Sequence, residues 1–133
     1  MKLNNIEQLE VFKLSIKLST DIYNVTKSFP KEELYGLVSQ MRRAVVSIGA
    51  NLMEGGARNS DGEYKHFIGI SRGSASELKC HLIISNELKF ISKEQSDDLI
   101  GRANQIVRML TGLLNSVSRP TTYDQRPASG ASQ

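Results

Sequence analysis

The residues of this chain that could carry out catalysis are few, and their spacing does not assemble a reactive site. Glu63 and His66 have the Glu-x-x-His spacing that helps to hold two metal ions in some helical bundles. Such a site needs a second pair of this kind and two more inward carboxylates, but His81 has Leu78 three residues before it. The first pair also lies off the apolar side of its predicted helix. We therefore expect no metal site.

Cys80 and His81 are adjacent, which suggests a thiol nucleophile with its base. Consecutive residues of a helix point about 100° apart, however, so this pair cannot form the hydrogen bond that activates a thiol. Gly55 and Gly56 lack the Lys-Ser/Thr that follows in a phosphate-binding loop. We expect a protein without enzymatic activity, cofactor or small-molecule substrate, because its inventory for general acid–base catalysis is so small. A metal-dependent enzyme is the weakest alternative.

Basic residues form the most informative chemical pattern in the chain. Those that we predict to contact RNA or DNA are Arg42, Arg43, Arg58, Lys65, Arg72 and Lys79. The last four recur every seven residues, so those on one helix share a face at intervals of roughly 10 Å. Such a row could follow a phosphate backbone and release its counterions. The net charge of +3 permits a nucleic-acid partner without requiring one, and a solvated or protein-contacting face is the alternative.

Length and composition indicate one globular domain. The chain has 133 residues, of which 39% are hydrophobic, and this is enough for a single core. Its apolar runs are too short to cross a bilayer, and its first residues include acids where a signal peptide would be apolar. Cys80 is the only cysteine, which suits a reducing compartment. We expect a cytoplasmic protein that does not contact membranes.

Helical spacing from about Ile6 to Phe29 places apolar residues on two sides of the first predicted helix. The stripe that faces the core is Val11, Leu14, Leu18, Ile22, Val25 and Phe29. The second stripe, roughly 140° away, is Leu9, Phe12, Ile16 and Tyr23. Because a helix in a monomeric bundle needs only one buried face, the second stripe predicts contact with another copy. The alternative is a single wide face that a neighbouring helix and the C-terminal tail cover.

Pro30 is predicted to end this helix and to open the second one, since it lacks an amide donor. Gly55 and Gly56 are predicted to end the second helix through the left-handed conformation that glycine tolerates. The predicted core residues between these ends are Leu34, Leu37, Val38, Met41, Ala44, Val45, Ile48 and Leu52. The apolar residues off this stripe, which we assign to the oligomer interface with spill-over from the core as the alternative, are Tyr35, Val46 and Met53.

A polar line also follows helical steps along the second predicted helix: Arg43, Ser47, Asn51 and Glu54. Two interpretations are open. Arg43 and Glu54 could each pair with another subunit, or the line could be exposed surface, where isolated ion pairs contribute little.

The third helix is predicted to begin at Asn59 or Ser60, and the fourth at a capping box of Ser92 and Gln95. The core stripe of the third is Tyr64, Phe67, Ser71, Ser74, Ala75, Leu78, Leu82 and Ser85. Its middle carries small side chains, which allow another backbone to approach closely. The core stripe of the fourth is Leu99, Ala103, Ile106, Val107, Leu110, Leu113 and Leu114. Short connections predict an all-α, up-down-up-down antiparallel four-helix bundle over residues 1–117, with a disordered tail over 118–133.

The segment from Tyr35 to Leu78 resembles the four-helix-bundle proteins encoded in intervening sequences of bacterial 23S rRNA genes. The matching motifs are Tyr35-Gly36-Leu37, Gln40 through Ala44, Ser47-Ile48, Asn51, Glu54-Gly55, Arg58, Tyr64 to Phe67, Gly73-Ser74 and Glu77-Leu78. The resemblance covers roughly positions 9 to 114. It departs at Gly49, where the family usually has proline, and at Gly56, where the family has a bulkier residue.

This resemblance implies a helical bundle that assembles as a ring-like homo-oligomer, a pentamer. It also implies distant similarity to the accessory proteins of diversity-generating retroelements, basic pentamers that work with a reverse transcriptase and nucleic acid. Our first hypothesis is a non-enzymatic homo-oligomer that binds RNA or DNA through its basic face. The second is a scaffold that docks a protein partner through an apolar face such as Tyr35, Val46 and Met53.

Overall fold

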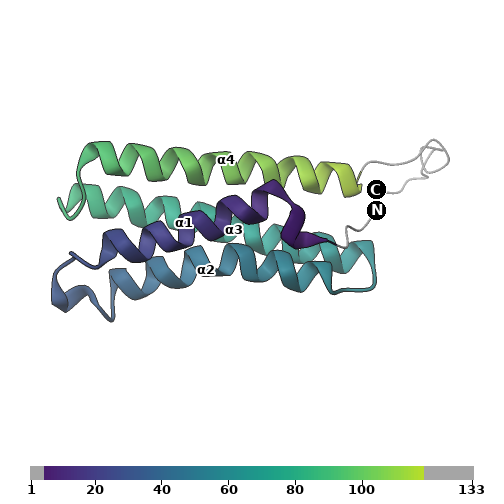
Figure 1. Ribbon diagram of the computed structural model, residues 1–133, viewed down its shortest axis with the longest axis horizontal. Helices are drawn as coiled ribbons and strands as arrows, with labels where there is room; N and C mark the ends of the chain where they lie inside the picture. Colours follow the sequence, from purple (N-terminus) through teal and green to yellow (C-terminus); the bar gives the residue numbers. More distant parts are fainter. Residues whose placement is uncertain (1–4, 119–133) are drawn as a thin grey trace.

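The computed structural model describes residues 5–118, which form four α-helices, two 3-10 turns and no strand. The α-helices are α1 Glu10–Thr26, α2 Leu37–Gly56, α3 Asp61–Glu87 and α4 Lys93–Ser118, and the 3-10 turns are η1 Ile6–Gln8 and η2 Lys31–Glu33. Figure 1 shows the four α-helices side by side along the long axis of the molecule. The predicted all-α fold with four helices is confirmed, whereas the predicted tail beyond Ser118 lies outside the described residues.

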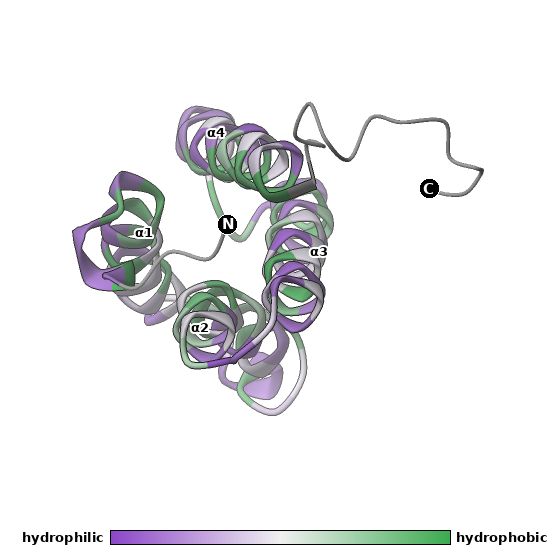
Figure 2. Cartoon of the chain, turned by 90° about the vertical axis from the view of Figure 1, so that its right-hand side faces the viewer, coloured by the Kyte–Doolittle hydropathy of each residue, from purple (hydrophilic) through white to green (hydrophobic). Residues whose placement is uncertain are grey.

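The helices pack around one core. Seen end-on in Figure 2, each helix turns hydrophobic residues towards the centre. α3 makes the most extensive contacts, with α2 on one side and α4 on the other; of the neighbouring pairs of helices, α1 and α4 touch least. The predicted core stripe of α3 is confirmed, except that Phe67 is half-buried and its neighbour Ile68 is fully buried instead.

The small side chains of α3 bring α2 close, as predicted. Ser71 Oγ donates a hydrogen bond of 2.7 Å to the carbonyl oxygen of Ile48, and the hydroxyls of Ser74 and Ser47 lie 2.8 Å apart. Hydroxyl contacts of this kind require the two backbones to lie nearer than leucine-sized side chains would allow. The polar groups of this stripe are therefore satisfied across the helix–helix contact.

The predicted start of the second helix at Pro30 is wrong. The chain makes the single turn η2 after Pro30, and α2 begins only after Gly36. Gly36 is the N-cap of α2, with φ −115° and ψ −108°, and so interrupts the helical backbone between η2 and α2. This break turns Leu34 away from the core, where we had placed it, and leaves that side chain 48% exposed.

Gly55 and Gly56 at the end of α2 allow close packing. The prediction that they form a left-handed C-cap is wrong. Neither glycine has a positive φ, and the residue after them, Ala57, is right-handed with φ −86°. A Cβ on Gly55 would lie 3.1 Å from the Cβ of Phe67, and one on Gly56 would overlap the side chain of Ile6. Any larger residue at position 56 would therefore displace Ile6 of η1.

Both predicted N-terminal caps are confirmed. Ser60 Oγ accepts a hydrogen bond of 3.1 Å from the amide of Glu63, so α3 begins as expected. Ser92 and Gln95 form a reciprocal capping box, in which each side chain accepts a hydrogen bond of 3.0 Å from the other residue's amide. Each cap satisfies amide groups that a helix leaves without partners at its first turn.

Lys89 gives the fold its first testable prediction. It has φ 64° directly after the C-cap of α3, where its amide donates to Asn86 O and the next amide donates to Ser85 O. A side chain in this conformation is strained, and glycine is not. We expect Lys89→Gly to raise the free energy of unfolding by about 0.5–1 kcal/mol in urea titrations. Lys89→Ala removes the same charge but keeps the Cβ, so equal stability of the two variants would contradict this explanation.

Candidate nucleic-acid interface

The predicted cations do not form one surface, because the packing of α2 and α3 divides them among three sides of the bundle. Lys65, Arg72 and Lys79 lie along the flank of α3 that meets α4, since Arg72 Nη1 donates a hydrogen bond of 3.1 Å to Thr111 Oγ1 on α4. Arg42 lies on the opposite side of the molecule, against α1, and Arg43 lies between α2 and α3.

Arg42 is occupied by contacts with the C-terminal end of α1. Its Nε donates to Thr26 Oγ1 at 3.0 Å, its Nη2 donates to the carbonyl oxygen of Tyr23 at 3.2 Å, and its guanidinium lies 4.5 Å from the centre of the Tyr23 ring. The cation favours both the carbonyl groups at a helix C-terminus and the aromatic face. Arg42 is therefore placed to fasten α2 to α1.

Arg58 is likewise held by its own chain. It forms an ion pair of 2.5 Å with Glu54, and its guanidinium lies 4.7 Å from the centre of the Phe67 ring. These contacts turn Arg58 towards α2 and away from Lys65, Arg72 and Lys79 on α3. The cationic row on α3 therefore has three members.

Lys65, Arg72 and Lys79 are not neutralised by acidic side chains of the described residues. Within residues 5–118, Lys65 and Lys79 form no ion pair, and the partner of Arg72 is a neutral hydroxyl. Arg108 on α4 is exposed and lies three residues before Thr111, so it borders the same flank. Sequence reasoning missed it, because nothing in the sequence of α4 says which side meets the cations of α3. We call this surface the α3–α4 basic surface: Lys65, Arg72, Lys79 and Arg108.

The polar line on α2 pairs within the chain. Arg43 Nη2 lies 2.9 Å from Glu77 Oε2, Asn51 Nδ2 donates to Ser47 Oγ at 2.8 Å, and Glu54 holds Arg58. The line forms an α2–α3 polar seam in which Arg43 and Glu54 both have partners within the chain, and the pairing of either residue with another subunit stays a prediction. Contact with α3 supplies the partners of Arg43 and Ser47, which are Glu77 and Ser74, whereas Glu54 pairs with Arg58 in the connection between the two helices.

Glu77 is the centre of this seam. The same Oε2 atom that meets Arg43 lies 3.1 Å from Nε2 of His81. The hydrogen bond to His81 and the charge of Arg43 hold the pKa of the Glu77 carboxyl below its usual value, although partial burial acts in the opposite direction. Nε2 of His81 thus contacts Glu77 one turn earlier on α3, and the side chain of the adjacent Cys80 is exposed.

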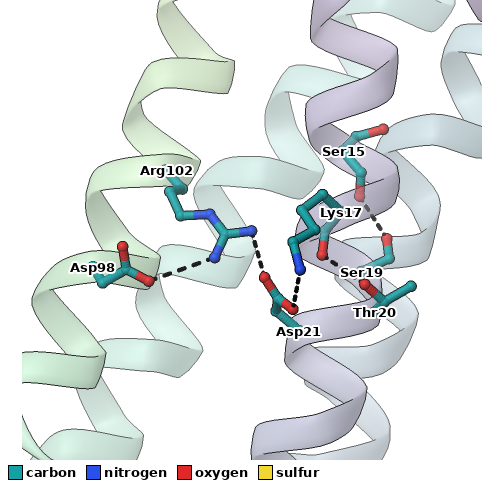
Figure 3. A network of polar contacts seen from close by, with 7 residues as sticks. All are labelled: Ser15, Lys17, Ser19, Thr20, Asp21, Asp98 and Arg102. Atoms are coloured by element: carbon teal, nitrogen blue, oxygen red, sulfur yellow. Dashed lines mark hydrogen bonds and ion pairs between the residues drawn. The ribbon is translucent and has the colours of Figure 1, made fainter.

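A second ionic cluster joins α1 and α4, the neighbouring helices with the fewest contacts between them. Figure 3 shows Asp21 of α1 between Lys17 and Arg102, with Oδ2 of Asp21 2.8 Å from Nη2 of Arg102 on α4. Lys17 contacts the other oxygen at 3.1 Å. Burial raises the pKa of Asp21, but the two cations outweigh it and leave the pKa lowered. The cluster therefore links α1 to α4 as long as Asp21 is ionised.

These carboxylates make stability depend on pH. The pKa values of Glu77 and Asp21 are lower in the folded protein than in the unfolded chain. Both carboxylates therefore stabilise the fold at pH values above their unfolded pKa, and this stabilisation is lost as the pH falls. We expect the free energy of unfolding to decline between about pH 5 and pH 3, and Glu77→Gln to flatten that decline. Urea titrations between these pH values measure the free energy of unfolding. Exposed Glu94→Gln is the control; a decline as steep in Glu77→Gln as in the control would contradict the assignment.

The residues predicted for the oligomer interface fall into two groups. Leu9 and Phe12 are half-buried and pack against the core, whereas Ile16, Tyr23, Tyr35, Val46 and Met53 are exposed. We call the exposed group the α1–α2 apolar strip. The two predicted stripes meet at Gly49, where a Cβ would lie 3.5 Å from Phe12 Cε1 and 3.6 Å from Ile16 Cδ1. Val46 and Met53 lie about one turn to either side of Gly49, so the strip is continuous across both helices.

No group of three or more metal-ligating side chains occurs within residues 5–118, and both Glu63 and His66 are exposed. None of the helices in this part of the chain is long and apolar enough to span a bilayer.

Comparison with known families identifies residues 7–112 as matching the model of the 23S rRNA-intervening sequence protein. The chain belongs to this family. No curated protein matches significantly. Among solved structures, a protein of unknown function from the S23 ribosomal protein family of Bacteroides thetaiotaomicron is 22% identical, with a TM-score of 0.73. The match covers 78% of this chain and 97% of the other, and at this identity it shows a shared fold.

Membership of the 23S rRNA-intervening sequence protein family confirms the resemblance read from the sequence motifs. Several of the polar residues in those motifs meet in the α2–α3 polar seam. The members of the seam that belong to the motifs are Gln40, Arg43, Ser47, Asn51, Glu54, Ser74 and Glu77. This seam holds α2 against α3, whereas the cations of the α3–α4 basic surface have no acidic partner within residues 5–118.

Proposed function

We propose that this family member is a non-enzymatic homo-oligomer that binds RNA or DNA through the α3–α4 basic surface. The observation that carries the proposal is the row of Lys65, Arg72 and Lys79, which have no acidic partner within residues 5–118. Their spacing of seven residues gives roughly 10 Å between neighbours along α3, and the long side chains reach phosphates on either side. Arg108 widens the charged surface onto α4.

The proposal includes an up-down-up-down course of the helices and a ring-like assembly, a pentamer. Short connections between consecutive helices favour antiparallel neighbours, and only residues 57–60 separate α2 from α3. The exposed α1–α2 apolar strip supports assembly, because a soluble monomer seldom leaves so continuous an apolar surface open to water. We place the protein in the cytoplasm, which suits its lone exposed cysteine.

A salt titration tests nucleic-acid binding. The probes are a fluorescent RNA hairpin and a DNA duplex of the same length, and the readout is anisotropy at rising NaCl. Phosphate contacts release counterions, so the association constant should fall linearly with salt on a double-logarithmic plot, with a slope of about −2 to −4. Absence of binding at about 50 mM salt, or affinity that does not respond to salt, would refute the proposal.

The alternative function is a scaffold that docks a protein partner through the α1–α2 apolar strip. Its specific support is Tyr35, which is 92% exposed and borders a depression lined by Tyr23, Leu34 and Arg42. An exposed aromatic ring beside an arginine is typical of residues that anchor protein interfaces. Capture from lysate treated with nuclease distinguishes the two functions: a partner retained after nuclease, and lost in Tyr35→Ala, supports the scaffold.

A further inference from the structure

α3 carries a second exposed apolar surface that the proposed function does not use. Ile70, Ile84 and Leu88 are all exposed, and helical steps place them on one side of α3. On the helical wheel this side lies about 140° from Lys65, Arg72 and Lys79. We call Ile70, Ile84 and Leu88 the α3 outer strip.

The two apolar strips carry opposite charges. Glu77 lies midway between Ile70 and Ile84, and Glu87 is exposed within one turn of Ile84 and Leu88, so acids accompany the α3 outer strip. Glu77 already meets Arg43, but exposed Glu87 forms no ion pair within residues 5–118.

Cations accompany the α1–α2 apolar strip. Lys13 lies about one turn before Ile16, Lys27 lies about one turn after Tyr23, and both lysines are exposed. Arg42 covers the Tyr23 ring between the two helices. The three acids of the same helices point elsewhere: Asp21 is bound to Arg102, Glu54 is bound to Arg58, and Glu10 lies about 120° from Ile16 around α1. The α1–α2 strip is therefore basic, and complements the α3 outer strip in both apolar character and charge.

One molecule cannot bring its own two strips together. In the end-on view of Figure 2, α1 and α3 stand on opposite sides of the bundle, with α2 below and between them. Two different surfaces that complement each other between copies make a head-to-tail contact, which leaves one unsatisfied strip at each end of a chain of copies. With such a contact, every strip is covered only when the copies form a closed ring.

We infer that the α3 outer strip of one copy packs against the α1–α2 apolar strip of the next copy. This inference rests on the homo-oligomer of the proposed function and specifies which surfaces meet in it. Apolar contact from Ile70, Ile84 and Leu88 provides the buried area, and Glu87 faces the cations at the rim. The α3–α4 basic surface stays outside the contact, so each copy in the ring keeps it open for nucleic acid.

Mixing two variants, each with one of the two apolar strips disrupted, tests whether these strips pair between copies. Ile84→Glu disables the α3 outer strip, Val46→Glu disables the α1–α2 strip, and both positions are exposed, so each variant should keep its helical circular dichroism. Light scattering should show oligomers for the parent chain and monomers for each variant alone. An equal mixture should form 1:1 heterodimers and nothing larger, because only one intact strip of each kind remains.

Other outcomes overturn the inference in distinguishable ways. If the parent is oligomeric and Ile84→Glu does not dissociate it, or if the mixture stays monomeric, the pairing of strips is wrong while the homo-oligomer stands. If the parent itself is monomeric, the homo-oligomer of the proposed function fails as well. Nucleic-acid binding is measured separately, by the salt titration.

The exposed Cys80 provides a second measurement that does not depend on weakening the contact. It lies within one turn of Glu77 and Ile84, and it is the only cysteine of the chain. Mild oxidation of Val46→Cys should link it to Cys80 of the next copy and give a ladder that extends beyond the dimer. The ladder should be absent when Cys80→Ser is added and absent for Gln105→Cys on α4. A ladder that stops at the dimer and persists with Cys80→Ser would instead show like strips in contact.

Discussion

Truncation of Ile68 to alanine is expected to lower the free energy of unfolding by about 2–5 kcal/mol, the largest stability effect predicted here for a single residue. Ile68 is 0% exposed, and it lies in the middle helix that contacts both α2 and α4. Alanine at this position loses the transfer free energy of the removed carbons and leaves a cavity that three packed helices cannot fully close. Urea titration at fixed protein concentration measures the change, since assembly would make stability depend on concentration.

Ile83 on the same helix is the matched control. The two residues have the same side chain, but Ile83 is 51% exposed and lies outside both apolar strips. Ile83→Ala should therefore change stability by less than about 1 kcal/mol. Equal losses in the two variants would mean that the core of α3 does not lie where the structure places it.

Replacement of Lys65, Arg72 and Lys79 together by glutamine is expected to weaken nucleic-acid binding roughly 10- to 100-fold at physiological salt. Each cation that neutralises a phosphate contributes about 0.9 to the salt slope on duplex DNA, so the slope should shrink by about two to three. Glutamine keeps much of the aliphatic length that packs on α3, and Thr111 can still accept a hydrogen bond at the Arg72 position. The far-ultraviolet circular dichroism spectrum should therefore be unchanged.

A triple variant with the same change in net charge separates local contact from overall charge. Lys17, Lys31 and Lys93 are exposed and lie away from the α3–α4 basic surface. Their replacement by glutamine should leave the salt slope nearly intact. If both triple variants lose affinity equally, the binding would follow net charge alone and the assignment of the α3–α4 basic surface would be wrong.

Sequence pattern predicted the helices well because the relevant forces are local. The capping box of Ser92 and Gln95 and the cap of Ser60 involve residues within a single turn, so their spacing alone identifies them. The periodicity of apolar residues identified most of the α3 core for the same reason. The errors arose where a local rule has two readings: Pro30 can open a helix or a single turn, and Gly55 can serve a left-handed cap or a close contact.

The candidate sites depended far more on the third dimension. Seven-residue spacing correctly placed Lys65, Arg72 and Lys79 on one flank of α3, but it could not reveal that Arg58 turns to Glu54 or that Arg108 joins from α4. Likewise, the exposed apolar residues of α1 and α2 were visible as two separate stripes. Their union at Gly49 required the crossing of the two helices.

The amino-acid sequence by itself determined the helices, their buried sides and the family, because hydrogen bonds and amphipathic periodicity act over a few residues. Only the tertiary structure decided which charges are already paired and which remain free, as Arg43 with Glu77 and Asp21 with Arg102 illustrate. The physical reason is that an ion pair between helices depends on their rotation and separation. Those quantities are set by the packing of the whole core.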